Sequence, residues 1–194
     1  MMWLAVAIAV ALLLALIGLY LSMTAGRLDR LHTRIDASRL TLASHLLRRS
    51  SVALELSTSG LLDPVSSVVI ADAAHLARTA QDGGSQGWAR AESDLTAALD
   101  AAFEDTEDVE YVMSNPVGTE LMEELAAVSV RIGLSRRFLN DAVRACRQVR
   151  AQRLVRWFRL AGHTELPTTF EMDDQIPRGL GSRGEGGFGT DALR

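Results

Sequence analysis

The stretch from Trp3 to Ser22 reads WLAVAIAVALLLALIGLYLS and is apolar apart from its last residue. Residues 1–26 carry no charged side chain, and Arg27 is the first charged residue after them. About 20 helical residues, each rising about 1.5 Å, cover the roughly 30 Å hydrocarbon core of a bilayer. The sequence therefore predicts a transmembrane anchor over residues 1–26.

A cleaved signal peptide is the alternative interpretation of this stretch. Signal peptides have a basic start, a shorter apolar run of about 7–15 residues and a small-residue cleavage site. Here only the amino group of the chain precedes the run. Trp3 and Tyr20 stand near its two ends, and aromatic side chains favour the headgroup region of a bilayer. We therefore expect an uncleaved anchor.

The charges beside the apolar run predict its orientation. Four arginines follow it directly, namely Arg27, Arg30, Arg34 and Arg39. By the positive-inside rule, residues 27–194 are expected in the cytoplasm and the N-terminus outside. The single cysteine, Cys146, cannot form an internal disulfide, which suits a reducing compartment. The expected location is the plasma (cytoplasmic) membrane, crossed once.

Helical periodicity dominates the rest of the chain, and no convincing strand pattern occurs. A row of residues spaced by three and four predicts the buried face of a first helix: Leu28, Leu31, Ile35, Ser38, Leu42, His45, Arg49, Val52 and Leu56. A second row, Leu40, Leu47 and Leu54, is expected to widen that face. His45 and Arg49 on the first row either form a buried polar contact, act as a pH-sensitive element, mark the packing register or lie at an edge open to water.

Three further helices are predicted after this one. Asp63-Pro64 and Asn115-Pro116 each combine a capping side chain with proline at the first helical position, and they begin helices of about 64–80 and 116–159. Between them, a helix over about 88–112 is expected to bury Trp88, Ala91, Leu95, Ala98 and Ala102. The longest helix is expected to bury Leu121, Leu125, Val128, Ile132, Ser135, Leu139, Ala142, Cys146 and Val149.

These elements predict an all-α fold. The N-terminal transmembrane helix is followed by an antiparallel bundle of about four helices, because short loops join antiparallel neighbours. Residues 27–160 are long enough for one core and are expected to form one domain. Residues 161–194 are rich in Gly, Pro and charge, with little to bury, and are expected to form a disordered tail.

One segment resembles the signature of the LemA family of bacterial membrane proteins. The family pattern Arg-x-x-Tyr/Phe-x-Asn-x-x-Val is similar to residues 131–143, and the residues that carry the likeness are Arg136, Arg137, Phe138, Asn140, Asp141 and Val143. Arg48-Arg49 and Thr169-Phe170-Glu171 extend it. Leu139 stands where the family usually has Tyr, so the chain resembles a divergent member. The resemblance implies an anchored helical bundle facing the cytoplasm, and it brings no catalytic residues.

An arginine occupies every third position from Arg144 to Arg159. Side chains three apart on an α-helix step round by about 60°, so these charges encircle the helix and do not form one stripe. Either a solvated face or contact with anionic lipid headgroups is expected. The candidate membrane-surface residues are Arg153, Arg156, Trp157, Phe158 and Arg159. The net charge of −4 and the lack of a recognised motif argue against a nucleic-acid partner.

Acidic residues gather between Asp100 and Glu124, where nine of them occur without any Arg. The spacing lacks the glycine-containing loop of an EF-hand, and no His lies three residues after a Glu, so a solvated face is expected. Cys146 lies on a predicted buried face and is expected to be a core residue. No catalytic residue, metal ligand or cofactor is predicted.

The function expected from these features is a non-enzymatic, membrane-anchored scaffold. Its expected partners are the lipid bilayer and either another protein or a second copy of the chain. The alternative is a metal- or nucleotide-dependent enzyme domain that uses the acidic residues 100–124.

Overall fold

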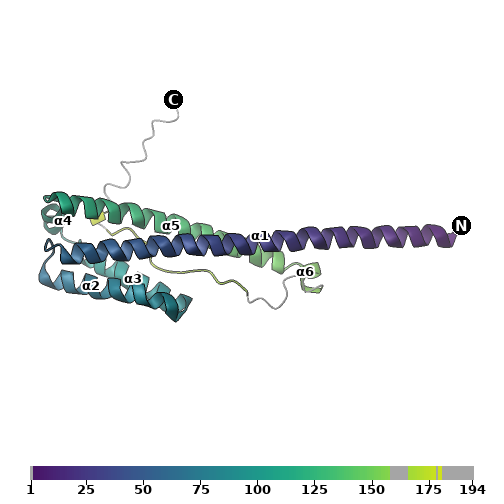
Figure 1. Cartoon of the computed structure of the whole chain (residues 1–194), viewed down its shortest axis with the longest axis horizontal. Helices are drawn as coiled ribbons and strands as arrows, with labels where there is room; N and C mark the ends of the chain where they lie inside the picture. The colour runs from purple at the N-terminus through teal and green to yellow at the C-terminus, as the bar shows by residue number, and fades with distance from the viewer. Residues whose placement is uncertain (1, 158–165, 178, 181–194) are drawn as a thin grey trace, which may run out of the picture. The chain divides into compact units, whose positions relative to one another are not determined.

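The computed structural model describes residues 2–157, 166–177 and 179–180 (Figure 1). This part of the chain is helical and contains no strand, so the predicted all-α fold with a long N-terminal helix and a helical bundle is confirmed. The helices are α1 (Met2–Thr58), α2 (Pro64–Thr79), η1 (Ala80–Gly83), α3 (Ser85–Ala102), α4 (Thr106–Met113), α5 (Pro116–Arg150) and α6 (Arg153–Trp157).

The chain divides into two compact units, whereas the sequence predicts one domain over residues 27–160. The first unit combines residues 1–38 with 139–169, and the second combines residues 39–138 with 170–194. The long helices α1 and α5 each contribute to both units. The buried faces of α1 and α5, which predict a single core, therefore each contribute to two separate units.

Capping side chains place the helix starts. Asp63 accepts hydrogen bonds from the N–H groups of Val65 and Ser66 at 2.8 and 3.1 Å, and Asn115 accepts one from Val117 at 2.9 Å. Both starts agree with the prediction. Asp105 also caps a helix, which begins at Thr106. The predicted helix over 88–112 is therefore wrong in its second half, since α3 ends at Ala102 and α4 is separate.

The predicted buried face of α5 agrees with the structure along its whole length, from Leu121 to Val149. The first row on α1 also agrees, with Leu28, Leu31 and His45 among its buried or half-buried members. In the second row, Leu54 is half-buried against the core, as predicted, but Leu40 is 73% exposed and Leu47 is 47% exposed, so the prediction is wrong at these two positions. Leu46 and Ala53 widen the buried face in their place.

The buried face of α3 differs from the prediction. The predicted residues Trp88, Ala91, Ala98 and Ala102 are only half-buried, and Leu95 alone among those predicted is fully buried. The residues that α3 buries are Ala89, Glu92, Leu95, Thr96 and Leu99. The face is rotated because it includes a carboxylate and a hydroxyl, which a count of apolar positions leaves out.

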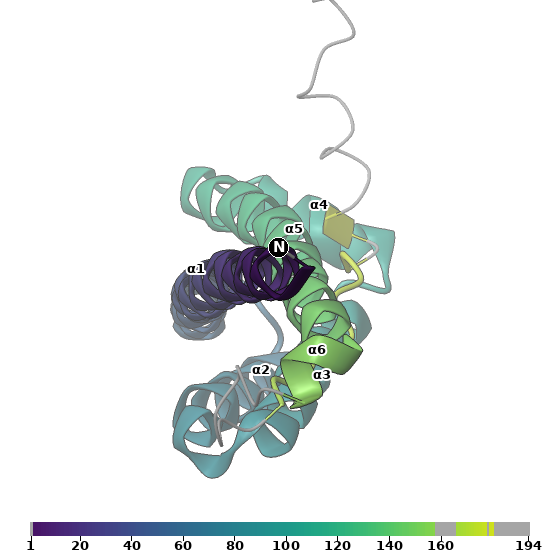
Figure 2. The ribbon, with the colours of Figure 1, turned by 90° about the vertical axis from the view of Figure 1, so that its right-hand side faces the viewer.

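The core of the second unit joins five helices. α2 and α3 lie side by side (Figures 1 and 2). Their buried side chains meet those of α1, α4 and α5 in one cluster, which includes Val52, Leu56, Ile70, Ala74, Ala77, Leu95, Leu99, Phe103, Val112, Met122 and Leu125. At the start of α5, a Cβ on Gly118 would lie 2.1 Å from the carbonyl oxygen of Val112. Glycine is therefore required where α4 and α5 meet.

A buried ion pair crosses this core from α1 to α3. Arg49 and Glu92 are each 2% exposed, and Arg49 Nη2 lies 2.6 Å from Glu92 Oε2. The same guanidinium donates to the Glu92 carbonyl at 2.9 Å and to Thr96 Oγ1 at 3.0 Å, while its Nε–H has no partner. Burial raises the pKa of the Glu92 carboxyl above its ordinary value, although Arg49 and the Trp88 indole N–H act in the opposite direction.

The expectation of a disordered tail over residues 161–194 is wrong for residues 170–177. Residues 170–177 form a strap that packs on the second unit, with Phe170 and Met172 buried. The Phe170 ring meets Trp88 edge-on, with centroids 4.9 Å apart. The Asp173 N–H donates to Ser93 Oγ, and Thr96 Oγ1 donates to the Asp173 carbonyl, both at 2.9 Å. The remainder of the predicted tail lies mostly outside the described residues.

Replacing Arg49 by Met should destabilise the chain by about 3–5 kcal/mol, because Glu92 is left as an unpaired buried carboxylate. The double variant Arg49→Met/Glu92→Leu should recover most of this loss, since it removes both charges. Urea unfolding of the full chain in an uncharged detergent, followed by circular dichroism, measures the difference. Equal losses in the single and double variants would contradict the assignment of a coupled pair.

The raised pKa of Glu92 predicts how stability depends on pH. The contribution of Glu92 to the free energy of unfolding is fully present below the ordinary carboxyl pKa of about 4.3. It is lost as the pH rises through the raised pKa that Glu92 has in the folded chain. Relative to Arg49→Met/Glu92→Leu, the wild-type chain should therefore gain stability as the pH falls from 7 towards about 4.3. The same unfolding measurement at several pH values tests this, and a gain at higher pH instead would show that Arg49 outweighs burial.

Candidate functional site

The C-terminal end of α5 meets α1 at the end of the apolar run. Within the first unit, the Tyr20 hydroxyl donates to Gln152 Oε1 at 3.2 Å. Gln152 lies in the turn after α5, where its own N–H donates to the Val149 carbonyl. One turn further along α1, Thr24 is 8% exposed and donates to the Tyr20 carbonyl. The arginine-rich end of α5 therefore lies beside the last turn of the apolar segment.

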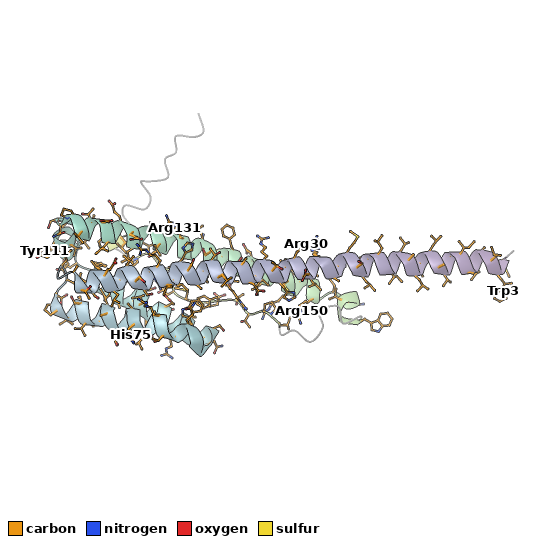
Figure 3. The ribbon with its side chains drawn as sticks, viewed as in Figure 1. Trp3, Arg30, His75, Tyr111, Arg131 and Arg150 are labelled. Atoms are coloured by element: carbon orange, nitrogen blue, oxygen red, sulfur yellow. The ribbon has the colours of Figure 1, made fainter. Side chains whose placement is uncertain are left out.

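Towards the N-terminus from this junction, α1 is a long, exposed apolar helix. A window of 18 residues in α1 has a mean hydropathy of 2.8, and none of it is buried inside the protein. By length and composition, this helix is able to cross a membrane. Trp3 lies at its far end, and Arg30 and Arg150 of the same unit lie beyond its near end (Figure 3).

The structure describes part of the predicted membrane-surface set. Arg153 is exposed at the start of α6, and Trp157 is 82% exposed at its end. Arg156 lies on α6 between them, and Phe158 and Arg159 lie outside the described residues. Val155, also on α6, is buried, with 2% of its surface exposed. The large exposed indole and an exposed guanidinium thus occur together on a short helix.

Charge is distributed unequally between the two units. The first unit carries nine Arg and four acidic residues, whereas the second carries 11 Arg and 20 acidic residues. The formal charges are therefore +5 and −9, excluding His. The overall net charge of −4 does not reveal this separation, because the separation depends on which parts of α1 and α5 pack together.

Cys146 is buried in the first unit, as predicted. It is 0% exposed, and its Sγ lies 3.9 Å from Nε2 of His32, whose Nδ1 lies 3.0 Å from the Leu28 carbonyl. Burial raises the pKa of the Cys146 thiol above its ordinary value, while the charge of Arg150 acts in the opposite direction. A raised pKa reduces the thiolate population, so this pair is poorly suited to nucleophilic chemistry.

The residues of the LemA-like signature have different environments. In the second unit, Arg136 donates to both carboxylate oxygens of Asp174 at 2.9 Å and lies 3.4 Å from Glu171, which ties α5 to the strap. Arg137 and Phe138 are exposed. In the first unit, Asn140 and Val143 are buried, and Asp141 pairs with Arg144. The structure does not bring these six residues together into one site.

Sequence reasoning missed the partners of Arg49 and Arg136. Glu92 was hidden by the apolar pattern assigned to α3, and Asp174 lies in a segment expected to be disordered. Among the described residues, no group of three or more His, Cys, Asp or Glu side chains is placed to hold a metal ion. Comparisons with protein-family models, with curated proteins and with solved structures find no match for this chain.

The burial of Cys146 predicts slow thiol modification. In the folded full-length chain in detergent, the thiol should react with a maleimide much more slowly than in denaturant, because it is covered by the packing of α1 and α5. Mass spectrometry over time measures both rates. Equal rates would place Cys146 at the surface and contradict the assigned buried face of α5.

Proposed function

We propose that this protein is a single-pass, membrane-anchored helical scaffold that binds another protein or a second copy of itself at the inner face of the plasma membrane. The observation that carries the proposal is the exposed apolar part of α1, none of which is buried within the protein. An apolar helical surface of this length needs hydrocarbon around it. The resemblance to LemA membrane proteins supports the same class.

The arginine-rich end is proposed to contact the membrane surface. Tyr20 is in the last turn of the apolar segment, and its bond to Gln152 keeps the turn before α6 at that level of α1. Exposed Arg153 and Trp157 then lie where a cationic and an amphipathic aromatic side chain are both favoured. The charge of +5 on the first unit agrees with an anionic surface, to which each nearby Arg adds about 1 kcal/mol.

The proposed orientation follows from the arginines after the apolar run. Arg27, Arg30 and Arg34 are exposed on α1 directly beyond it, and they favour the cytoplasmic side. In right-side-out membrane vesicles, an added protease should leave residues 27–194 intact, and in inverted vesicles it should digest them. Resistance of the chain to extraction by alkaline carbonate tests insertion itself. Extraction into the soluble fraction would refute the anchor.

Trp157 should report contact with lipid. The fluorescence of Trp157 is the difference between the wild-type chain and Trp157→Phe, measured in nanodiscs that contain brominated lipid. This fluorescence should be quenched more strongly when the lipid is anionic than when it is neutral. Added salt should reduce the difference, because the Debye length falls to about 3 Å at 1 M. Arg153→Glu should reduce it further. Equal quenching in anionic and neutral lipid would contradict the proposed membrane contact and show that the arginines form a solvated face.

A further inference from the structure

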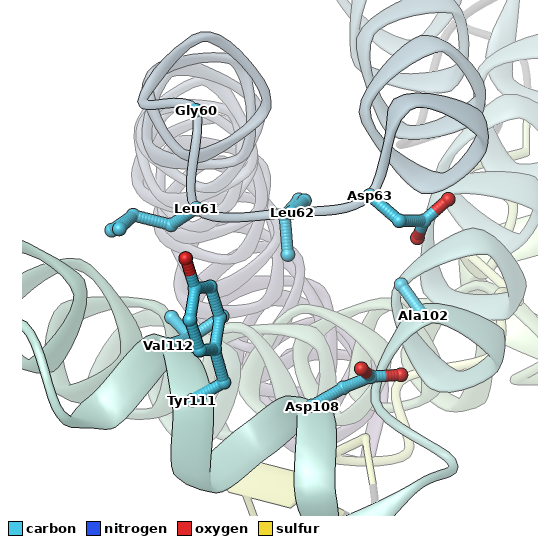
Figure 4. Close-up of a pocket in the computed structure, with 8 residues that line it drawn as sticks. All are labelled: Gly60, Leu61, Leu62, Asp63, Ala102, Asp108, Tyr111 and Val112. Carbon is cyan, nitrogen blue, oxygen red and sulfur yellow. The ribbon is translucent and has the colours of Figure 1, made fainter.

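The second unit contains a pocket of about 310 Å³ at the end where α1, α3 and α4 meet their connecting turns. Its lining comprises two carboxylates, one tyrosine and several apolar groups, contributed by Gly60, Leu61, Leu62, Asp63, Ala102, Asp108, Tyr111 and Val112. Asp63 and Asp108 lie on the Ala102 side, and the Tyr111 hydroxyl points towards Leu61 (Figure 4). The volume is at the lower end of the range for ligand sites.

The electrostatics of this pocket favour a cation. Two carboxylate side chains, those of Asp63 and Asp108, line the pocket, and both residues are exposed. No basic residue occurs in the sequence between Arg90 and Arg131, a span that includes all of α4. Glu104, Glu107 and Glu110 add further exposed negative charge next to the pocket.

Asp63 keeps its charge while it caps α2. The Ser66 hydroxyl and the N–H groups of Ser66 and Val65 hold the pKa of Asp63 below its ordinary value. The backbone bonds go to Oδ1, and Asp63 is exposed, so its carboxylate remains accessible to a ligand. Because a structural role fixes this side chain, part of the pocket is preorganised.

The apolar lining suits an alkyl chain. Leu61, Leu62 and Ala102 are half-buried and pack against the core of the second unit. Val112 is fully buried in that core. Tyr111 is 63% exposed at the rim, where an aromatic ring can also interact with a cation. Arg and Lys combine an apolar stem with a charged end, which matches a pocket that is apolar within and anionic at its walls.

We infer that this pocket binds the side chain of an Arg or Lys in a basic segment of a partner protein. The inference rests on the proposed scaffold function, because it specifies the chemistry of the protein partner. The charge of −9 on the second unit extends the same complementarity beyond the pocket. The guanidinium or ammonium group bonds to Asp63 and Asp108, and neighbouring apolar residues of the segment contact Tyr111.

A fluorescein-labelled, end-blocked peptide of sequence Leu-Arg-Leu-Leu-Arg is the probe, and the full chain in uncharged detergent is the target. Fluorescence anisotropy should detect binding, and the matched peptide with Glu in place of Arg should not bind. Asp108→Asn should weaken binding about fivefold, in line with an exposed ion pair. Asp63→Ser, which retains a capping side chain, should do the same.

Glu107→Gln is the matched control, because it removes one charge from an exposed neighbour of Asp108 that does not line the pocket. It should change affinity by less than about twofold. Ala102→Leu should weaken binding by filling the pocket while keeping every charge. Thermal melting of each variant checks folding. An equal effect of Glu107→Gln, or no effect of Ala102→Leu, would place the peptide on a diffuse acidic surface and overturn the inference.

The same preparations separate this inference from the proposed anchor. Peptide binding is measured in detergent and does not depend on membrane insertion, which carbonate extraction tests independently. Loss of peptide specificity in a chain that resists extraction would overturn the pocket assignment alone. Specific peptide binding by a chain that is extracted would overturn the anchor alone.

Discussion

The buried guanidinium of Arg49 is the constraint on which the second unit depends. A charge that is 2% exposed requires a counter-charge and hydrogen-bond acceptors within reach, and α3 supplies them through the side chains of Glu92 and Thr96 and the Glu92 carbonyl. This requirement determines which face of α3 is turned inward. Rotating α3 by one residue towards its more apolar side would separate the charges and leave both unpaired.

The same polar contact extends to the strap. Thr96 accepts from Arg49 and donates to the Asp173 carbonyl, while Trp88 donates to Glu92 and packs against Phe170. Arg136 and Asp174 add a second attachment between α5 and the strap. A segment without regular secondary structure is thus held because its backbone groups satisfy polar atoms that the helices leave at the edge of the core.

Local signals in the sequence predicted the features that depend on local physics. Asp63 and Asn115 identify helix starts because a cap needs only its own side chain and the next three residues. The buried face of α5 follows from periodicity, since every member of that row is buried. The row of Leu40, Leu47 and Leu54 has the same periodicity, but no element of the described chain covers Leu40 and Leu47. Periodicity identifies a face and does not identify what packs on it.

The candidate sites depend on contacts between distant segments, and the sequence predicted them less completely. The arginines near the end of α5 were visible as a pattern, but their place beside the apolar segment depends on Tyr20 and Gln152, which are 132 residues apart. The pocket beside α4 requires the separate α4 that Asp105 begins. A continuous helix over 88–112 would carry Asp108 and Tyr111 past the turn at residues 60–63, so the missed cap also concealed the pocket.

The unequal charges of the two units connect these sites to function. A surface that attracts the first unit, with its charge of +5, repels the second, with its charge of −9. An anionic bilayer therefore favours contact through Arg153 and Trp157 and disfavours contact through Asp63 and Asp108. A basic protein segment has the opposite preference. The two proposed partners would therefore use different surfaces and would not compete for the same one.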